Sequence, residues 1–186
     1  MAVREILTSE HPVLRQKAKK IKRVDASTQK LVDDMLESMR EAHGLGLAAP
    51  QIGVGLRVLV IEIPEDEEIR GGEQIILINP EILKAEGEQF GEEGCLSIPG
   101  YVGMVRRADQ VSVKGLNRKG KEVRVKGTGL LARALQHEID HLDGILFTDR
   151  LERREDLYRI GDENERIPVF QRGAGRPIKK KEAILT

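Results

Sequence analysis

The sequence predicts an α+β fold in which antiparallel or mixed β-sheets pack around a central helix. Two observations predict it. Segments with apolar residues at helical spacing occur in the first and last thirds of the chain, and short segments rich in β-branched residues lie between them. Because these strands come in runs, regular alternation of strand and helix is not expected. The 186 residues suffice for one domain with a substantial core.

Two helices and two strands are predicted in the first half of the chain. Residues 10–20 are predicted to form a short helix with Pro12 near its first turn. Residues 27–42 are predicted to form a stronger amphipathic helix that Ser27 caps. The strands are predicted at residues 57–64 and 74–83, with an acidic surface loop at residues 64–72.

The second half begins with strands predicted at residues 111–116 and 122–125. An apolar helix follows, with Thr128 at its N-cap position and Gly144 placed to end it. Its apolar residues recur at near-helical spacing and predict a core helix: Leu130, Leu131, Ala134, Leu135, Ile139 and Leu142. A last helix is predicted at residues 149–159.

The most informative stretch lies in the apolar helix. Two of the four histidines, His137 and His141, are four residues apart, so both imidazoles share one helix face and could bind one metal ion. Glu138 lies beside them, where a carboxylate could move a proton at an open metal position. Asp140 faces away from that side and is expected to be solvated, with a supporting role behind the ligands as the alternative. The alternative is a pair of surface histidines on an ordinary amphipathic helix.

A catalytic zinc or iron site usually takes three protein ligands and keeps a fourth position for water. Cys95, the only cysteine, is the better candidate for the third ligand, because a thiolate binds zinc or ferrous iron well. The alternative is a small buried hydrophobe, the commonest fate of a free cysteine. The longer protease pattern would want a histidine where this chain has Phe147. Downstream glutamates also stay open as ligands: Glu152, Glu155, Glu163 and Glu165.

A third unusual segment, residues 44–53, has small residues and no charges. Its glycines let the backbone approach a ligand closely. Gln51 offers an amide that could donate a hydrogen bond to a developing oxyanion. The alternative is a tight helix-to-strand turn in which Gln51 is simply solvated.

Three segments together resemble the signature motifs of peptide deformylases in order and spacing. They are residues 44–51 (GLGLAAPQ), 93–97 (EGCLS) and 136–142 (QHEIDHL). The resemblance runs from about Arg4 to about Glu152, which is most of the chain. It implies a metal-dependent hydrolase that removes the N-formyl group from the initiator methionine of nascent polypeptides and releases formate.

The resemblance also implies the site residues. One divalent metal would be held by three ligands: Cys95, His137 and His141. Fe²⁺ is the physiological metal of the family, and Zn²⁺, Ni²⁺ or Co²⁺ can replace it. Glu138 would take a proton from the attacking water and return it to the leaving amine. The Gln51 side-chain amide and the Leu96 backbone N–H would stabilise the oxyanion.

The implied substrate is an extended peptide that lies against the sheet and meets the backbone of Gly46. Arg133 stands where members can carry an apolar residue, which would make the pocket rim more polar. Val102 stands where other members carry an arginine. The methionine pocket would be lined by Leu45, Leu130 and Ala134. For Leu130, packing in the core is an equally good interpretation.

Composition agrees with a compact cytoplasmic enzyme. The 31 basic and 31 acidic side chains give no net charge, so no specific DNA binding is expected. No apolar run is long enough to span a membrane, and the N-terminus lacks the apolar core of a signal peptide. Residues 1–160 are predicted to form a single catalytic metallohydrolase domain. Residues 161–186 are predicted to form a polar, basic tail that could touch the ribosome surface.

Two other functions stay open. A zinc protease with the same histidine frame would need a downstream third ligand, and Phe147 disfavours its commonest form. A non-enzymatic ribosome- or peptide-binding protein with a structural metal is disfavoured by Glu138 beside an open ligand set. Replacing Cys95 with alanine separates the three, because only a deformylase would lose formate release together with its metal.

Overall fold

The computed structural model describes residues 2–63 and 73–170. The acidic loop predicted at residues 64–72 and residues 171–186 of the predicted tail lie outside the described residues. Among the helices in the described ranges, none is long and apolar enough to cross a membrane.

Two antiparallel sheets form the body of the protein. One has five strands in the order β1-β2-β3-β6-β7, and the other has four in the order β4-β5-β8-β9. The strands are β1 (Gly46–Ala48), β2 (Val58–Ile63), β3 (Glu73–Glu86), β4 (Gln89–Cys95), β5 (Ile98–Arg107), β6 (Gln110–Leu116), β7 (Glu122–Thr128), β8 (Leu157–Ile160) and β9 (Arg166–Pro168). The four predicted strands correspond to β2, β3, β6 and β7, and the α+β prediction is confirmed.

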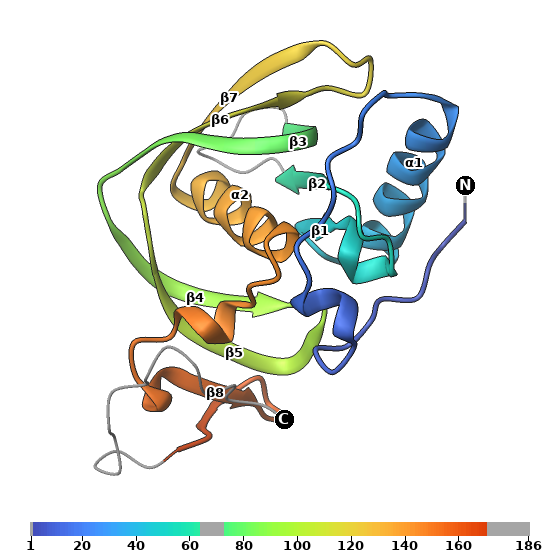
Figure 1. Ribbon diagram of the computed structural model, residues 1–186. Coiled ribbons are helices and arrows are strands. Elements are labelled where there is room, and N and C mark those ends of the chain that lie inside the picture. The colour runs from blue at the N-terminus through green and yellow to red at the C-terminus, as the bar shows by residue number, and fades with distance from the viewer. Residues whose placement is uncertain (1, 64–72, 171–186) are drawn as a thin grey trace.

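Helix α2 (Gly129–Leu142) is the centre of the fold. Figure 1 shows it between the five-stranded sheet on one side and strands β4 and β5 on the other. Its apolar face packs Leu135 and Ile139 into a core cluster with Leu59 and Val113 of the five-stranded sheet. Each fully buried side chain of this kind contributes about 1.5–3 kcal/mol. The predicted central helix is therefore held in place chiefly by its apolar face.

The two ends of α2 lie at glycines. Gly129, its first residue, has φ of +51°, and Gly144, which follows its end, has φ of +75°. A Cβ on Gly144 would lie 2.8 Å from the backbone carbonyl of Arg15, so only glycine fits. The prediction that Gly144 ends the helix is confirmed. Thr128 holds the N-cap position as predicted, but its side chain makes no capping hydrogen bond to the described residues.

Helix α1 (Ala26–Glu41) packs on β1 and β2 on the outer side of the five-stranded sheet (Figure 1). Its cap is Asp25, whose carboxylate accepts hydrogen bonds of 3.0 Å from the N–H groups of both Ser27 and Thr28. The prediction that Ser27 caps the helix is wrong. The aspartate two residues earlier reaches the same free N–H groups, so the helix starts one residue sooner.

Two predicted helices are also wrong. Within residues 10–20 only a 3-10 turn forms, at Pro12–Arg15. Within residues 149–159 the chain makes 3-10 turns (Phe147–Arg150, Arg154–Asp156) and then enters β8. Both stretches contact other parts of the fold through their backbones: the Ala18 N–H donates to the Leu142 carbonyl, and β8 pairs with β5. These tertiary contacts override the local helical pattern.

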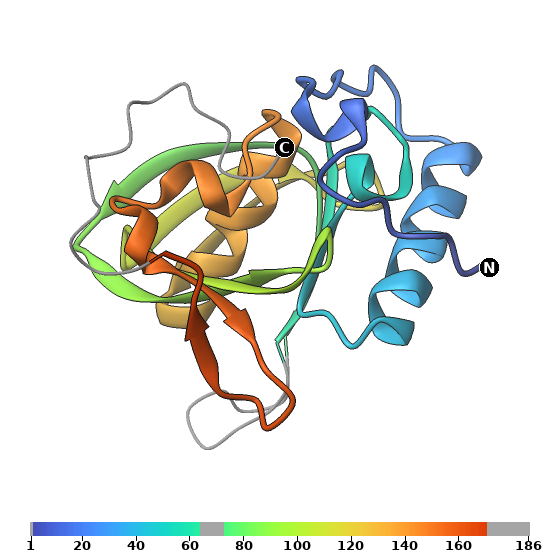
Figure 2. The ribbon, with the colours of Figure 1, turned by 90° about the horizontal axis from the view of Figure 1, so that it is seen from below.

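Strands β8 and β9 form a hairpin that adds to the free side of β5, with Val102 opposite Tyr158 (Figure 2). The boundary predicted after residue 160 falls in the turn of this hairpin. The division into a domain and a tail stays a prediction.

Candidate active site

The three side chains predicted as metal ligands lie together between β4 and α2. Cys95 ends β4, at an irregularity in its pairing with β5, and His137 and His141 lie one turn apart on α2. The Cys95 Sγ lies 3.2 Å from the His141 Nε2. One ligand atom from each of the three residues lies within 4.8 Å of the others. The fold thus places Cys95 beside two histidines that follow it in the chain by more than forty positions.

The alternatives for the third ligand, a downstream glutamate or a histidine at position 147, are not found in the cluster of described residues. Glu152 pairs with Arg106 on the surface. Phe147, at the position where the protease pattern would place a histidine, is buried and stacks at 6.4 Å from the His137 ring. Within the described ranges, the group of potential ligands contains the cysteine and no downstream glutamate.

The buried imidazoles suit metal binding. His137 Nδ1 lies 2.9 Å from Glu93 Oε2, which leaves the His137 Nε2 for a metal. Burial lowers the pKa of His141 well below its usual value, so the ring is neutral, as a ligand must be. Burial opposes the charged form of His137 as well, but the Cys95 thiol and the Glu93 carboxylate outweigh it and raise the pKa. One sulfur and two ring nitrogens in this cluster fit a divalent transition metal.

Glu93 is the buried carboxylate that orients His137. Its oxygens accept hydrogen bonds from Arg107 Nε (2.8 Å) and Nη2 (3.0 Å) and from Arg133 Nη1 (2.9 Å). Burial alone would raise the pKa of Glu93, but the hydrogen bonds from Arg107 and His137 outweigh it and lower the pKa. The carboxylate therefore stays charged inside the protein.

Asp140 continues this buried network, and the prediction that it is solvated is wrong. It is 7% exposed, accepts from Arg107 Nη1 at 2.5 Å, and forms a two-point ion pair with Arg150. Arg107, the last residue of β5, reaches this carboxylate and keeps it from solvent. A chain of alternating charges thus runs from Glu93, the partner of His137, through Arg107 and Asp140 to Arg150.

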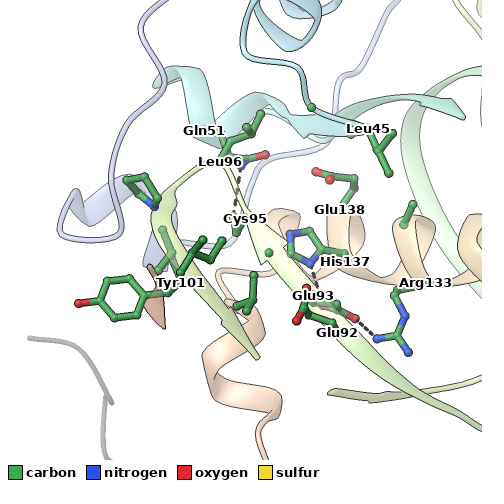
Figure 3. A pocket seen from close by; sticks show the side chains of 18 of the residues that line it. Leu45, Gln51, Glu92, Glu93, Cys95, Leu96, Tyr101, Arg133, His137 and Glu138 are labelled. Carbon is green, nitrogen blue, oxygen red and sulfur yellow. Dashed lines mark hydrogen bonds and ion pairs between the residues drawn. The ribbon is translucent and has the colours of Figure 1, made fainter. Parts of the chain in front are cut away.

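Glu138 lies in the wall of the same pocket as Cys95 (Figure 3). It is 4% exposed, and its Oε2 has no hydrogen-bond partner among the described residues. Burial raises the pKa of Glu138 to about 7. A carboxyl group with such a pKa can both accept and return a proton near neutral pH.

The Gln51 side chain is held by a hydrogen bond from the Ala48 N–H to its Oε1, 2.8 Å long. This bond turns the Nε2 toward Ser97 Oγ (3.2 Å) and Cys95 Sγ (3.6 Å). The amide is therefore buried and aimed at Cys95, one of the candidate ligands, and the alternative of a solvated Gln51 is wrong. Leu96 follows Cys95 in the turn between β4 and β5 and also lines the pocket.

The pocket has a volume of about 450 Å³. Leu45 and Leu130 are 41% and 44% exposed, so Leu130 is not packed in the core. Ala134 also lines the pocket, as do Gly46 of β1 and residues 92–95 of β4. Both strands are outer strands of their sheets, so two sheet edges contribute to the pocket.

Sequence reasoning missed the roles of several residues at the site. Glu93 belongs to the motif at residues 93–97, but no role is predicted for it, and Arg133 is predicted only to make the pocket rim more polar. A ligating histidine needs a partner for its second nitrogen, and this rule could have signalled a buried carboxylate. It could not have selected Glu93, because that contact depends on how β4 lies against α2. Tyr101 and Ile160, at the outer part of the pocket, gave no sequence signal.

A thiol and two imidazoles around one point, with a poised carboxyl beside them in an open pocket, define the class of protein: a metal-dependent hydrolase. The family model described as polypeptide deformylase matches residues 3–156. The chain belongs to the polypeptide deformylase family.

Individual relatives agree with this assignment. A peptide deformylase of Thermomicrobium roseum is 58% identical over 167 residues, which cover 89% of this chain and 95% of the relative. A crystal structure of a peptide deformylase from Legionella pneumophila has a TM-score of 0.74 and 50% identity, covering 81% of this chain and 86% of that one. A Met-Ala-Ser-bound class I type b peptide deformylase from Acinetobacter baumannii has a TM-score of 0.75 and 34% identity, covering 81% and 99%.

Proposed function

We propose that this chain hydrolyses the N-formyl group of the initiator methionine of nascent polypeptides, releasing formate and a free amino terminus. One observation carries the proposal. In a member of this family, the Cys95 Sγ and a nitrogen of each of two imidazoles lie within 4.8 Å of one another, beside the carboxyl group of Glu138. The bond to be broken is an amide, whose hydrolysis requires an activated water, a stabilised oxyanion and a proton for the amine.

The metal ligands in this proposal are Cys95, His137 and His141. When bound, a divalent metal supplies Lewis-acid chemistry that lowers the pKa of water and polarises the formyl oxygen. We take Fe²⁺ as the native metal, with Zn²⁺, Ni²⁺ or Co²⁺ as substitutes. The mixed thiolate and imidazole set is compatible with all four ions.

Glu138 acts as the proton carrier. Its carboxylate takes a proton from the water whose oxygen attacks the formyl carbon. When the carbon–nitrogen bond breaks, the same carboxyl group gives that proton to the departing amine. Burial supports this role, because it raises the pKa of Glu138 to about 7. Near neutral pH the group can therefore accept a proton in one step and return it in the next.

Gln51 and Leu96 stabilise the negative charge that develops on the formyl oxygen. The Ala48 N–H fixes the Gln51 carboxamide so that the Nε2 faces Cys95 and needs no reorganisation during the reaction. The Leu96 backbone N–H, from the pocket-lining residue after Cys95, is the second donor in this proposal.

The methionine side chain enters the apolar side of the pocket, formed by Leu45, Leu130 and Ala134. The peptide backbone pairs with Gly46 on the open edge of β1. The backbone carbonyl of Leu45 accepts a hydrogen bond from the Glu62 N–H of β2. Because hydrogen-bonded and non-hydrogen-bonded pairs alternate along antiparallel strands, the N–H and C=O of Gly46 turn away from β2. The tripeptide Met-Ala-Ser bound to the Acinetobacter baumannii relative has the sequence of a deformylated amino terminus.

The test uses a formyl-Met-Ala-Ser peptide and the variant Cys95→Ala. We expect the variant to lose bound metal and formate release together, while His11→Ala, an exposed change in the Pro12–Arg15 turn, keeps both. A Cys95→Ala protein that retains metal and still cleaves peptides internally would point to a protease. A wild-type protein that binds metal but never releases formate would point to a binding protein.

Two finer predictions concern the surroundings of the enzyme. A cytoplasmic location is proposed because formylated amino termini arise on ribosomes. Contact with the ribosome surface is proposed for the basic part of residues 161–186, most of which lie outside the described ranges.

A further inference from the structure

Arg133 is a buried cation one helical turn before His137 on α2. It is 8% exposed, and its guanidinium turns toward β4 and away from solvent (Figure 3). Guanidinium groups stay charged in proteins, so a buried one must find several acceptors. Arg133 is among the residues that line the pocket, as the expected polar rim requires, but its charge is satisfied by acceptors inside the protein.

The guanidinium of Arg133 spans two strands. Its Nη1 lies 2.9 Å from Glu93 Oε1, 3.2 Å from the Gly91 carbonyl oxygen and 3.1 Å from the Val105 carbonyl oxygen. Its Nε lies 3.2 Å from Gln89 Oε1. Three of these acceptors belong to β4 and one to β5. A single side chain of α2 thus fastens the helix to the strand that ends at Cys95.

This link matters because the three metal ligands come from two different elements. Cys95 lies at the end of β4, whereas His137 and His141 lie on α2. A shift of β4 along α2 would separate the sulfur from the imidazoles. Arg107 of β5 also binds Glu93 and pairs with Asp140 of α2, so it links β4 to the helix from a third element, whereas Arg133 links them from the helix itself.

The two oxygens of Glu93 have different partners on α2. Oε1 accepts from Arg133 Nη1 and Arg107 Nε, while Oε2 accepts from Arg107 Nη2 and meets His137 Nδ1 at 2.9 Å (Figure 3). Because Arg133 and His137 are both on α2, they hold the carboxylate from two successive turns of one helix. The carboxylate cannot then rotate without losing an ion pair, and the His137 ring keeps the orientation that presents Nε2 to a metal.

We propose that Arg133 is a positioning residue for the metal centre. It fixes Glu93 against α2, and through Glu93 it sets the His137 ring and the distance between Cys95 and the two imidazoles. The inference rests on the proposed metal ligands and deepens that proposal. It assigns to this arginine the retention of the metal and no contact with substrate.

The test measures zinc release from the full-length, Zn²⁺-loaded chain to a chromophoric chelator. We expect Arg133→Met to release Zn²⁺ about 10- to 100-fold faster than the wild type, the usual effect of losing an outer partner of a metal ligand. Arg133→Lys keeps the charge but cannot reach four acceptors at once, so its release rate should lie between the two. With Co²⁺ in the site, the sulfur-to-cobalt absorption band should shift in Arg133→Met.

Arg57→Met is the matched control. Arg57 is also buried, and it binds the end of α2 through the Leu142 carbonyl (3.1 Å) and Asp143 (2.7 Å), with none of its side-chain hydrogen bonds in the described residues going to Glu93. We expect this variant to lower the melting temperature and to leave the zinc release rate at the wild-type value. A general loosening of α2 would instead accelerate release in both variants.

A double-mutant cycle with Glu93→Gln tests the route of the effect. If Arg133 acts through Glu93, the combined variant releases Zn²⁺ little faster than the faster single variant. Wild-type release rates in Arg133→Met, or in Arg133→Lys should the methionine variant not fold, would overturn the inference. Multiplying effects in the cycle would also overturn it. A wild-type chain that binds no Zn²⁺ or Co²⁺ would refute the proposed function instead.

Discussion

The Glu138 carboxylate occupies the space that a side chain at position 46 would need. A Cβ built on Gly46 would lie 2.4 Å from Glu138 Oε1 and 2.9 Å from the carboxyl carbon. Glycine at this position of β1 therefore lets the edge of the five-stranded sheet touch the proposed proton carrier on α2. The contact explains the glycine by sterics, since Gly46 is not among the residues with positive φ.

Gly46→Ala should displace the Glu138 carboxyl group. A misplacement of about 1 Å at a catalytic group can reduce the rate about 100-fold, and we expect a loss of that order in kcat/KM for formate release. Gly55→Ala is the control, because a Cβ there meets no described atom within 4 Å. Full activity in Gly46→Ala would show that Glu138 can move freely without cost.

Glu138→Gln should abolish proton transfer and leave the fold intact. The amide keeps the size of the carboxyl group but cannot carry the proton, so we expect kcat to fall about 100- to 10,000-fold. Stability should not fall, because Glu138 Oε2 has no hydrogen-bond partner in the described part of the chain and the change removes a buried ionisable group. Metal content and melting temperature, measured beside formate release, separate this outcome from loss of the site.

Gln51→Leu should reduce kcat about 100- to 1,000-fold, the usual effect of removing one oxyanion donor, with a smaller change in KM. The change also leaves the Ala48 N–H without its acceptor, so a loss of about 1–3 kcal/mol in the free energy of unfolding is expected. Steady-state kinetics and urea unfolding measure the two effects separately. A variant that loses only stability would argue against the oxyanion role.

Removing the metal with a chelator should stop formate release but leave the chain folded. Helix α2 is anchored by an apolar face against Leu59, Val113 and their neighbours, and these contacts do not depend on a metal. We expect the melting temperature to fall and then recover when Zn²⁺ or Co²⁺ is added back, since a ligand that binds only the folded state stabilises it. Unfolding of the stripped chain would show that the metal is needed for the fold itself.

Asp34 provides a pH-dependent contribution to stability far from the site. A hydrogen bond from Lys30 and another from the Ala2 N–H lower the pKa of Asp34 below its usual value, although its removal from water opposes this. The carboxylate therefore stabilises the fold at pH values above the usual pKa, and this contribution disappears as the pH falls through the lowered value. Asp34→Asn should be less stable than the wild type at pH 7, and the difference should shrink toward pH 3. A difference that is constant with pH would contradict the assignment.

The sequence predicted more of the site than of its surroundings. His137 and His141 could be paired from their spacing, and Cys95 could be chosen because it is the only cysteine. Asp140 was misjudged, since helical geometry gives the direction of a side chain but not the strand that covers it. The buried acceptors of Arg133 could not be predicted for the same reason. Its acceptors lie on β4 and β5, and neither strand was predicted from the pattern of apolar residues.

By itself the sequence determined the central helix, four of the strands and the residues proposed as ligands. These depend on local quantities: the spacing of apolar residues, the separation of two histidines by one helical turn, and a motif order shared with a family. Only the tertiary structure decided which groups support those ligands. The Glu93 contacts with Arg107, Arg133 and His137 require β4 and β5 to lie side by side against α2. Such contacts join residues distant in the chain, and their free energy comes from burial and pairing in the folded state, which no local pattern records.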